Sequence, residues 1–438
     1  MEAVTGRVSI ASILNHQNNW QRYLAWQGDS VDEWTRHVVT RTMACRTPLL
    51  GCHIAACRDC GVARLIPHSC KTAFCTSCGT ARLTDWCDKQ LGEMLDVPYR
   101  HLVFTLPCEL RHLIRHNKAV LLSAMYRACS RAVLSLTSGN PAPLPGKNRK
   151  RMARKRKRYR PGIMIVCHTF GSDLGFNPHL HVIVTSGGLS LDGSRWIDAP
   201  KRSLVRVHDL AREWKKNFIA EIRDVEQRGL LEHPPFRGDP DNPTKVEPLL
   251  ICVSKKRWWV SIGPSLEEID HTVRYCVRYS RRPVIGETRI VKYDGKDVYF
   301  LYTDYADGGR KKVRRRSVLH FILRLVQHIP PKNFIQVRHY GIFATAVKGD
   351  LLPRARKRLG QRKRRRKRPQ DWEARRKARG EKEPLACPRC GKTMEIVGML
   401  FGCPETIAEI AGVADSHERL PPNCVVPLSR LQRLSRVG

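Results

Sequence analysis

Two histidines stand two residues apart at the head of the apolar run "HLHVIV". In an extended strand, the side chains at positions i and i+2 point to the same face. His179 and His181 would therefore share one face, while Leu180, Val182 and Val184 would point to the other, into a core. Neutral imidazole is a common metal ligand, but histidine is also frequent as a plain polar residue at the margin of a sheet. The pair alone leaves both interpretations open.

The strand-like run before this pair supplies a third imidazole. The runs "IMIVCHTF" and "HLHVIVT" are joined by "GSDLGFNP", whose Gly, Asp and Asn-Pro residues are typical of a hairpin connection. Across such a hairpin His168 would be a third ligand, with Asp173 as a further candidate. An Mg²⁺ or Mn²⁺ ion held by so few protein ligands keeps coordination positions open for phosphate oxygens.

Two tyrosines lie one helical turn apart in the segment "SLEEIDHTVRYCVRYSRRPV". Ser265 followed by Glu268 is a capping-box signature, so the pattern predicts a helix that begins there and ends before Pro283. Tyr275 and Tyr279 would stack beside the apolar stripe of this helix. That stripe consists of Ile269, Val273, Cys276 and Val277.

These two phenols are either aromatics at the edge of a core or nucleophiles. A phenol is a weak nucleophile at neutral pH, because its reference pKa is about 10. A phosphodiester bound to a metal ion is more electrophilic, and the charge of its transition state is stabilised. Attack by a phenolate would leave a covalent phosphotyrosine, which keeps the bond energy for a later strand transfer.

Cysteines dominate the N-terminal part of the chain. The sequence has 17 of them, and two Cys-x2-Cys pairs stand close together in "CRDCGVARLIPHSCKTAFCTSC". Two such turns can hold one tetrahedral Zn²⁺, although the gap between them is one residue shorter than is usual in zinc ribbons. Buried free cysteines are the alternative. The pattern predicts one zinc site made of Cys57, Cys60, Cys75 and Cys78.

Two further sets of thiols and imidazoles have less regular spacing. The first would be a second N-terminal site made of Cys45, His53, His68 and Cys70. The second would be a C-terminal zinc knuckle made of Cys387, Cys390, Cys403 and either His417 or Cys424. Both have the residue types that zinc prefers, and both remain open at this stage.

The charge of the chain points to a polyanionic partner. Lys and Arg total 79 against 40 for Asp and Glu, which gives a net charge of +39. Nucleic acid is the default partner of so basic a protein, and an anionic membrane surface is the alternative. Two basic runs, 147–160 and 354–379, would contact DNA or serve as solvated tethers. The DNA-contacting candidates in them are Arg154, Lys155, Arg156, Lys157, Arg158, Arg364, Arg365 and Arg366.

The remaining pattern indicates a folded protein with several domains. With 42% hydrophobic residues, the chain can bury a core. It shows neither a signal-like N-terminus nor an apolar run of about 18 residues. We therefore expect a cytoplasmic, nucleoid-associated protein without a membrane partner. We expect a helix and zinc-binding domain at 1–95, a catalytic domain at 96–346, and a basic arm with a cysteine-containing unit at 347–438. Strands are predicted at 99–106, 256–262 and 334–345, and helices at 205–222 and 316–331.

An adjacent pair of tryptophans marks the strand predicted at 256–262. Neighbouring side chains of a strand point to opposite faces, so one member of the pair normally belongs to the core. The other could stack single-stranded bases. The sequence does not say which of Trp258 and Trp259 does so.

Several motifs in a fixed order resemble those of the two-tyrosine HUH transposases of rolling-circle insertion sequences. They are "FTLP", "CHTFGSDLGFNPHLHVIVTSGGL", "YCVRYSRRP" and "FIQVRHYGIFA", and the cysteine segment before them resembles the zinc-binding domain of the same family. The resemblance spans roughly residues 45–345. It implies an α+β, Rep-like HUH nuclease domain whose central antiparallel sheet carries the histidines and is flanked by helices, plus a small N-terminal zinc-binding domain.

The resemblance also implies roles for residues of this chain. Tyr275 and Tyr279 would be the nucleophiles, and His179 and His181 would bind the divalent ion, whereas His168 as third ligand is an inference from the hairpin alone. One tyrosine would nick single-stranded DNA at an element end and take the 5′ phosphate, with double-stranded DNA at the ends and target as further partners. A host replication helicase would unwind the strands, because the closest approach to a phosphate loop, "ACPRCGKT", lacks its first glycine. A plasmid replication initiator and a non-enzymatic zinc-ribbon protein are the alternatives.

Overall fold

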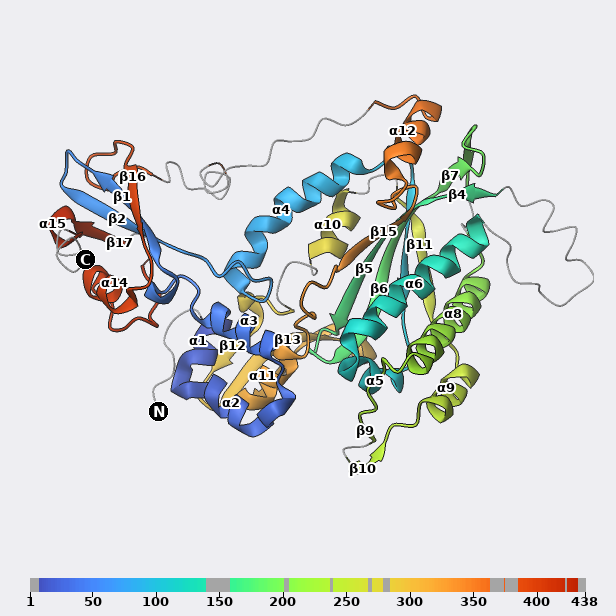
Figure 1. Cartoon of the computed structure of the whole chain (residues 1–438), viewed down its shortest axis with the longest axis horizontal. Coiled ribbons are helices and arrows are strands. Elements are labelled where there is room, and N and C mark those ends of the chain that lie inside the picture. The colour runs from blue at the N-terminus through green and yellow to red at the C-terminus, as the bar shows by residue number, and fades with distance from the viewer. Residues whose placement is uncertain are drawn as a thin grey trace, which may run out of the picture. The chain divides into compact units, whose positions relative to one another are not determined.

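The computed structural model describes residues 8–138, 158–200, 205–236, 239–266, 270–278, 284–362, 374, 385–421 and 424–431. The chain forms two compact units (Figure 1). Unit 1 comprises residues 1–86, 281–329 and 367–438, and unit 2 comprises residues 87–280 and 330–366. These units differ from the three consecutive domains expected from the sequence, because each unit is assembled from separate stretches of the chain.

Unit 2 is built on a five-stranded sheet with the order β11-β3-β6-β5-β15. Every neighbouring pair in it is antiparallel. Its strands are β11 (Val260–Leu266), β3 (Tyr99–Phe104), β6 (Phe176–Thr185), β5 (Gly162–Phe170) and β15 (Val337–Gly341). The predictions of an α+β fold with a central antiparallel sheet, and of a hairpin that carries the histidines, are confirmed.

One face of this sheet is covered by helices (Figure 1). They are α5 (Leu110–His116), α6 (Lys118–Thr137), α8 (Val207–Gln227) and α9 (Val246–Lys255). Leu180, Val182 and Val184 are completely buried in this core, as the alternation along the strand predicted. Helix α6 is long and apolar enough to cross a membrane by length and composition alone, although no such run was expected from the sequence. In the structure, 61% of its most apolar stretch is buried, as in the core helix of a globular domain.

The opposite face of the sheet carries helix α10 (Asp270–Arg278) near the histidines. Val273 and Cys276 of this helix are completely buried, as expected for its apolar stripe. The predicted start of the helix was wrong, because Ser265 lies in β11 and pairs with Arg100 of β3. Strand pairing therefore takes the residue that the capping-box pattern assigned to a helix. Glu268 lies outside the described residues.

Smaller elements complete unit 2. A helix that begins in unit 1, α4 (Thr76–Glu93), continues into unit 2, and α12 (Lys348–Arg358) follows the last strand of the sheet. A three-stranded sheet has the order β4-β7-β8, and a two-stranded one pairs β9 with β10. Their bounds are β4 (Tyr159–Arg160), β7 (Gly187–Ser190), β8 (Trp196–Asp198), β9 (Pro235–Phe236) and β10 (Asp239–Pro243).

Unit 1 contains a helical part that packs on a small antiparallel sheet. The sheet order is β12-β13-β14, and Asn19 donates a hydrogen bond of 2.7 Å to the Tyr293 hydroxyl of β12. The helices are α1 (Ile10–Asn15), α2 (Asn19–Gln27), α3 (Glu33–Met43) and α11 (Val318–Val326). The strands are β12 (Ile290–Tyr293), β13 (Asp297–Asp304) and β14 (Arg310–Ser317). Short 3-10 helices are η1 (His16–Asn18), η2 (Gly28–Ser30), η3 (Pro48–Leu50), η4 (Glu287–Arg289) and η5 (Tyr305–Asp307).

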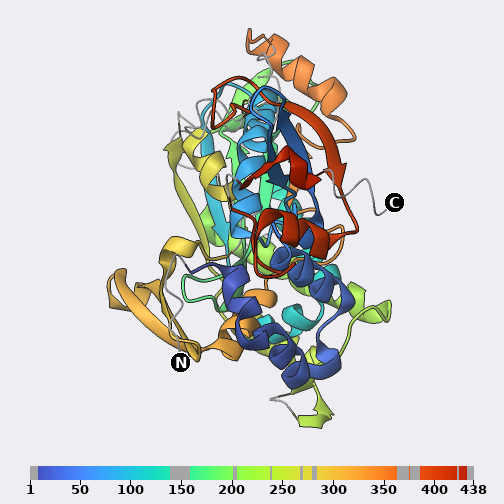
Figure 2. The same ribbon diagram turned by 90° about the vertical axis from the view of Figure 1, so that its left-hand side faces the viewer.

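A second sheet of unit 1 joins the two ends of the chain. Its order is β16-β1-β2-β17, so the N-terminal hairpin is flanked on both sides by C-terminal strands (Figure 2). The strands are β16 (Glu395–Leu400), β1 (Cys52–Cys57), β2 (Val62–Pro67) and β17 (Cys424–Pro427), with helices α14 (Pro404–Ala411) and α15 (Leu428–Leu431) beside them. The C-terminal cysteines therefore do not form a separate unit.

Candidate active site and metal centres

Three imidazoles converge on one face of the central sheet of unit 2. His168 of β5 stands directly opposite His179 of β6, and His181 follows two residues later on the same face. One ligand nitrogen of each lies within 4.8 Å of the other two. Ring centroids are 4.2 Å apart for His168 and His181, and 5.0 Å apart for His179 and His181. The hairpin thus brings together the three histidines that the sequence singled out.

The second ring nitrogen of each imidazole has a partner. His179 Nδ1 lies 2.7 Å from the carbonyl oxygen of Asn177, and His168 Nε2 lies 2.8 Å from that of Cys276. A carbonyl oxygen only accepts, so these nitrogens carry the proton and the other nitrogen of each ring keeps its lone pair. Metal-binding histidines use this arrangement, in which the distal N–H is held by a carbonyl. The geometry therefore fits a cation at the centre of the three rings.

A fourth histidine, which sequence reasoning missed, supports the cluster. His101 of β3 places its Nε2 at 2.8 Å from Nδ1 of His181, and the two rings stack at 5.1 Å. The Sγ of Cys276 lies 3.5 Å from the same nitrogen of His101. The available signal was the alternation along "YRHLVF", where Leu102 and Phe104 face the core and His101 must face the other side.

Burial keeps these imidazoles neutral. Burial, followed by the charge of the neighbouring His179, lowers the pKa of His168 to about 3. The pKa of His181 is also lowered, first by burial and then by His168 and His179. Burial also lowers the pKa of His179, and the positive charge of Arg111 lowers it further. Neutral imidazoles at pH 7 are ready to bind a cation. Among the described residues the group contains imidazoles alone, which would leave the full charge of that cation for an anionic substrate.

Asp173, the other candidate ligand, has a different position. Its carboxylate accepts a hydrogen bond of 3.1 Å from the backbone N–H of Gly175, inside the hairpin connection. It is not a member of the three-histidine group among the described residues. The turn therefore uses this side chain to fix its own backbone.

Tyr275 lies on the face of the sheet that carries the histidines. Its ring centroid is 6.2 Å from that of His181, and the two rings meet edge to face at 79°. The phenol is 44% exposed, whereas Cys276 beside it is completely buried. Arg274 anchors the helix through an ion pair of 2.6 Å with Asp88. Tyr279 lies outside the described residues.

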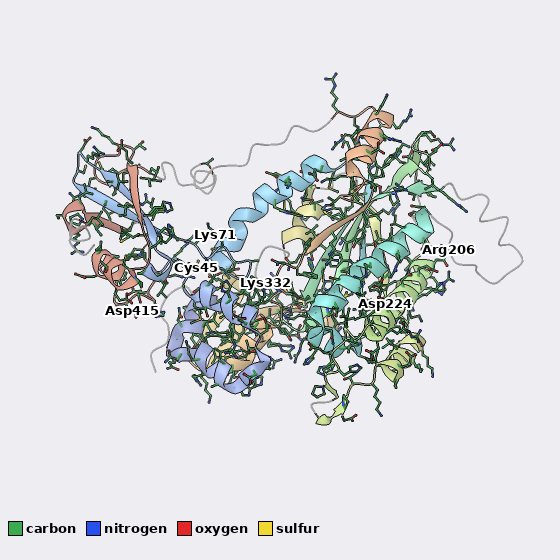
Figure 3. All side chains as sticks on the ribbon, in the orientation of Figure 1. Cys45, Lys71, Arg206, Asp224, Lys332 and Asp415 are labelled. Carbon is green, nitrogen blue, oxygen red and sulfur yellow. The ribbon has the colours of Figure 1, made fainter. Side chains whose placement is uncertain are left out.

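Cysteines of unit 1 form two clusters of four, and neither is a set that the sequence predicted. The first consists of Cys45, Cys70, Cys75 and Cys78, and Cys45 is labelled in Figure 3. The second consists of Cys57, Cys60, Cys387 and Cys390. In the first cluster, the Sγ of Cys45 lies 3.5 Å from that of Cys78 and 3.6 Å from that of Cys75.

The predicted site made of Cys57, Cys60, Cys75 and Cys78 is therefore wrong as a set. Cys57 pairs with Val62 at the turn of the β1–β2 hairpin, whereas Cys75 follows its open end. The six residues of β2 span about 20 Å, which is too far for one ion to bridge. The turn of the hairpin instead meets the C-terminal Cys-x2-Cys turn, and the Sγ atoms of Cys57 and Cys390 are 3.7 Å apart.

The other expected sets also differ from the structure. His68 Nε2 contacts His53 Nδ1 at 2.7 Å, but neither belongs to a cysteine cluster. Cys403 and Cys424 belong to neither cluster and pack with the apolar core formed by β1, β2, β17 and α14. Burial raises the pKa of Cys52 in that core to about 12, which is the behaviour of a structural thiol.

Most of the basic candidates lie outside the described residues. They are Arg154, Lys155, Arg156, Lys157, Arg364, Arg365 and Arg366. Arg158 is described and exposed, directly before β4. The tryptophan pair divides as expected, because Trp258 is 4% exposed and Trp259 is 60% exposed.

Two family models match the chain in the order that the structure shows. Residues 15–106 match the model described as "Transposase zinc-binding domain", and residues 162–350 match the one described as "Putative transposase". The first range contains the N-terminal thiols of both clusters, and the second contains the histidine hairpin and helix α10.

Two curated relatives are similar over most of their length. One is "Putative transposase y4qJ" of Sinorhizobium fredii, 28% identical over 76% of this chain and 80% of the relative. Another is "Transposase for insertion sequence element IS801" of Pseudomonas savastanoi pv. phaseolicola, 27% identical over 72% of each chain. No solved structure matches the chain. The fold, the thiol clusters and these matches define a DNA-processing enzyme of the transposase class. Over residues 15–106 and 162–350, the chain is similar to transposases of insertion sequences.

Proposed function

We propose that this transposase cuts single-stranded DNA at the ends of its element by tyrosine attack, as an HUH nuclease does. Tyr275 is the nucleophile, and His168, His179 and His181 hold a divalent ion, Mg²⁺ or Mn²⁺. The observation that carries the proposal is the ring contact between Tyr275 and His181, because it brings a partly exposed phenol to the group of three imidazoles, of which His168 and His181 are buried.

The chemistry follows from these positions. The phenol of Tyr275 loses its proton and its oxygen bonds to phosphorus, while the bond from phosphorus to the 3′ oxygen breaks. The 5′ phosphate stays on the tyrosine, and the 3′ hydroxyl is released. The bound ion supplies stabilisation of the charge that develops on the phosphate oxygens. The carbonyl oxygens of Asn177 and Cys276 hold the imidazoles in the required tautomers.

Strand transfer requires a second nucleophile while the first link persists. Tyr279, four residues after Tyr275 in the sequence, has the spacing for this role. The 3′ hydroxyl released by one cut resolves a phosphotyrosine, so each bond broken is matched by one that forms. No nucleotide is consumed, and unwinding falls to a host replication helicase in the cytoplasm, at the nucleoid.

The two cysteine clusters hold one structural Zn²⁺ each. Four thiols at mutual contact distance form a closed tetrahedral site, which leaves no position for substrate. The ion of the first cluster links the segment between α3 and η3 to the start of α4. The ion of the second cluster links the N-terminal hairpin to the C-terminal Cys-x2-Cys turn. In both places the metal would add its binding free energy to the small apolar cores of this part of the chain.

A covalent adduct tests the proposed reaction. The protein is incubated with a single strand of the element's terminal sequence and Mn²⁺, and protein–DNA adducts that survive denaturation are measured on a gel. The Tyr275→Phe, Tyr279→Phe double variant should lose the adduct and still bind the strand. Tyr305→Phe is a matched control, because that phenol is 81% exposed and lies in unit 1. If the double variant still forms the adduct, the nucleophile assignment is wrong.

The metal assignment has its own test. His179→Ala combined with His181→Ala should remove the adduct at every Mn²⁺ concentration, while His112→Ala, an exposed imidazole of α5, should leave it unchanged. Full nicking by the double histidine variant would contradict the metal site. A zinc-ribbon protein without catalytic activity would form no adduct in any variant.

A further inference from the structure

Trp259 is an exposed aromatic residue at the start of an edge strand. Its neighbour Trp258 packs against Trp214 and Phe218 in the core of unit 2, at ring distances of 5.8 and 6.2 Å. Trp259 itself is 60% exposed, the largest exposed fraction of any tryptophan that the structure describes as exposed. Burying so large an aromatic surface against a ligand would be favourable.

The strand register places Trp259 on the histidine face of the sheet. Val260 pairs with Phe104, and Thr105 donates its backbone N–H to the Trp259 carbonyl at 3.0 Å. Val103 pairs with His181, and Thr105 lies two residues further along the same face. Because Phe104 and Val260 both face the core, Thr105 and Trp259 must face the other side. Trp259 therefore stands two strands from the histidines, with the strand backbones about 10 Å apart.

The surroundings of Trp259 are basic. The Arg257 guanidinium lies over the indole ring at 4.1 Å from its centroid. Lys255 and Arg257 are both exposed. An aromatic ring beside such cations is the combination with which proteins hold a single strand, since the ring stacks on a base and the cations meet the phosphates.

We propose that Trp259 stacks on a base of the single strand next to the phosphate that is cut, with Arg257 contacting the adjoining backbone. The inference rests on the proposed function, because the histidine site fixes where the reacting phosphate lies. Stacking two strands from the histidines would hold the single strand in register on the sheet face without reading its sequence.

The test separates stacking from charge. Binding of fluorescein-labelled oligothymidylate and of an abasic oligomer of equal length is measured by anisotropy, without added Mg²⁺ or Mn²⁺ so that no cutting occurs. Trp259→Ala should weaken oligothymidylate binding about tenfold and leave binding of the abasic oligomer unchanged. Trp259→Phe should restore most of the loss, because a phenyl ring still stacks. Trp26→Ala, another exposed tryptophan, is the matched control.

Two results would overturn the inference. One is a Trp259→Ala protein that binds oligothymidylate as the unchanged protein does. The other is an equal loss of affinity for both oligomers, or an equal loss in the Trp259→Ala and Trp259→Phe variants. Either loss would indicate that Trp259 has a structural role. Because no catalytic ion is added and no DNA is cut, these outcomes do not depend on the adduct experiment. A missing adduct together with a base-specific loss of binding would refute the nuclease proposal alone.

Discussion

The histidine site and the cysteine clusters are built from the chain in opposite ways. The three imidazoles come from one hairpin, whose strands pair directly at His168 and His179. The second cysteine cluster joins residues 333 positions apart, Cys57 and Cys390. Local alternation therefore determines the first site, whereas the second exists only once the two ends of the chain have paired as strands β1 and β16. The comparison teaches that local spacing predicts ligands reliably only where one supersecondary element holds them all.

Zinc content gives the largest effect that could break this comparison. Cys57→Ser and Cys75→Ser should each remove one ion and leave the other, because they lie in different clusters. Each ion contributes on the order of 10 kcal/mol of binding free energy to its part of the fold, so each variant should also become sensitive to proteolysis there. Zinc per chain is measured in purified protein, with Cys252→Ser, an exposed thiol outside both clusters, as control.

The double variant sharpens the result. Cys57→Ser with Cys75→Ser should lose both ions if the clusters are separate. If the double variant retains as much zinc as either single variant, the two thiols share one ion and the grouping described above is wrong.

Removal of His101 gives an intermediate effect at the other site. Loss of the hydrogen bond to His181 Nδ1 should lower Mn²⁺ affinity by about 10- to 100-fold, because second-sphere partners orient a ligand ring. His101→Gln, which keeps an amide in reach of that nitrogen, should retain part of the affinity. Titration calorimetry with Mn²⁺ measures both variants, and unchanged affinity in His101→Ala would show that His181 needs no such support.

The same contrast explains what could be predicted from the sequence. The hairpin, the amphipathic helix with Tyr275 and the split of Trp258 from Trp259 all depend on periodicity within a few residues, and all were predicted correctly. The cysteine grouping was wrong because spacing alone does not reveal a pairing between β1 and β16. Ser265 was assigned to a helix because a capping pattern depends only on nearby residues, whereas its strand conformation comes from pairing with β3. His101 was missed because its role requires the register between β3 and β6.

The smallest effect is a dependence of stability on pH. Burial holds the pKa of His168 at about 3 in the folded protein, against an ordinary value of 6.5. Between these values the unfolded chain binds a proton that the native state does not, so stability is lost as pH falls below about 6.5. For this residue the loss should reach about 2 kcal/mol by about pH 5.

Urea unfolding at neutral pH and at pH 5, without added Mg²⁺ or Mn²⁺, measures this loss in the free energy of unfolding. The His168→Gln variant lacks that imidazole. Its free energy of unfolding should therefore fall less between the two pH values, and the difference should equal the loss expected for His168. An equal pH dependence in the variant and the unchanged protein would show that His168 is not a buried neutral group.

If the histidines of the central sheet and the two tyrosines act on the same phosphate, peptide mapping of the adduct should find the DNA on those tyrosines. Trypsin cuts after Arg274, Arg278 and Arg281, so the two tyrosines fall in separate peptides, 275–278 and 279–281. After nuclease digestion of the adduct, mass spectrometry should find the nucleotide remnant on one or both of these peptides. A remnant carried by any other peptide would contradict the account.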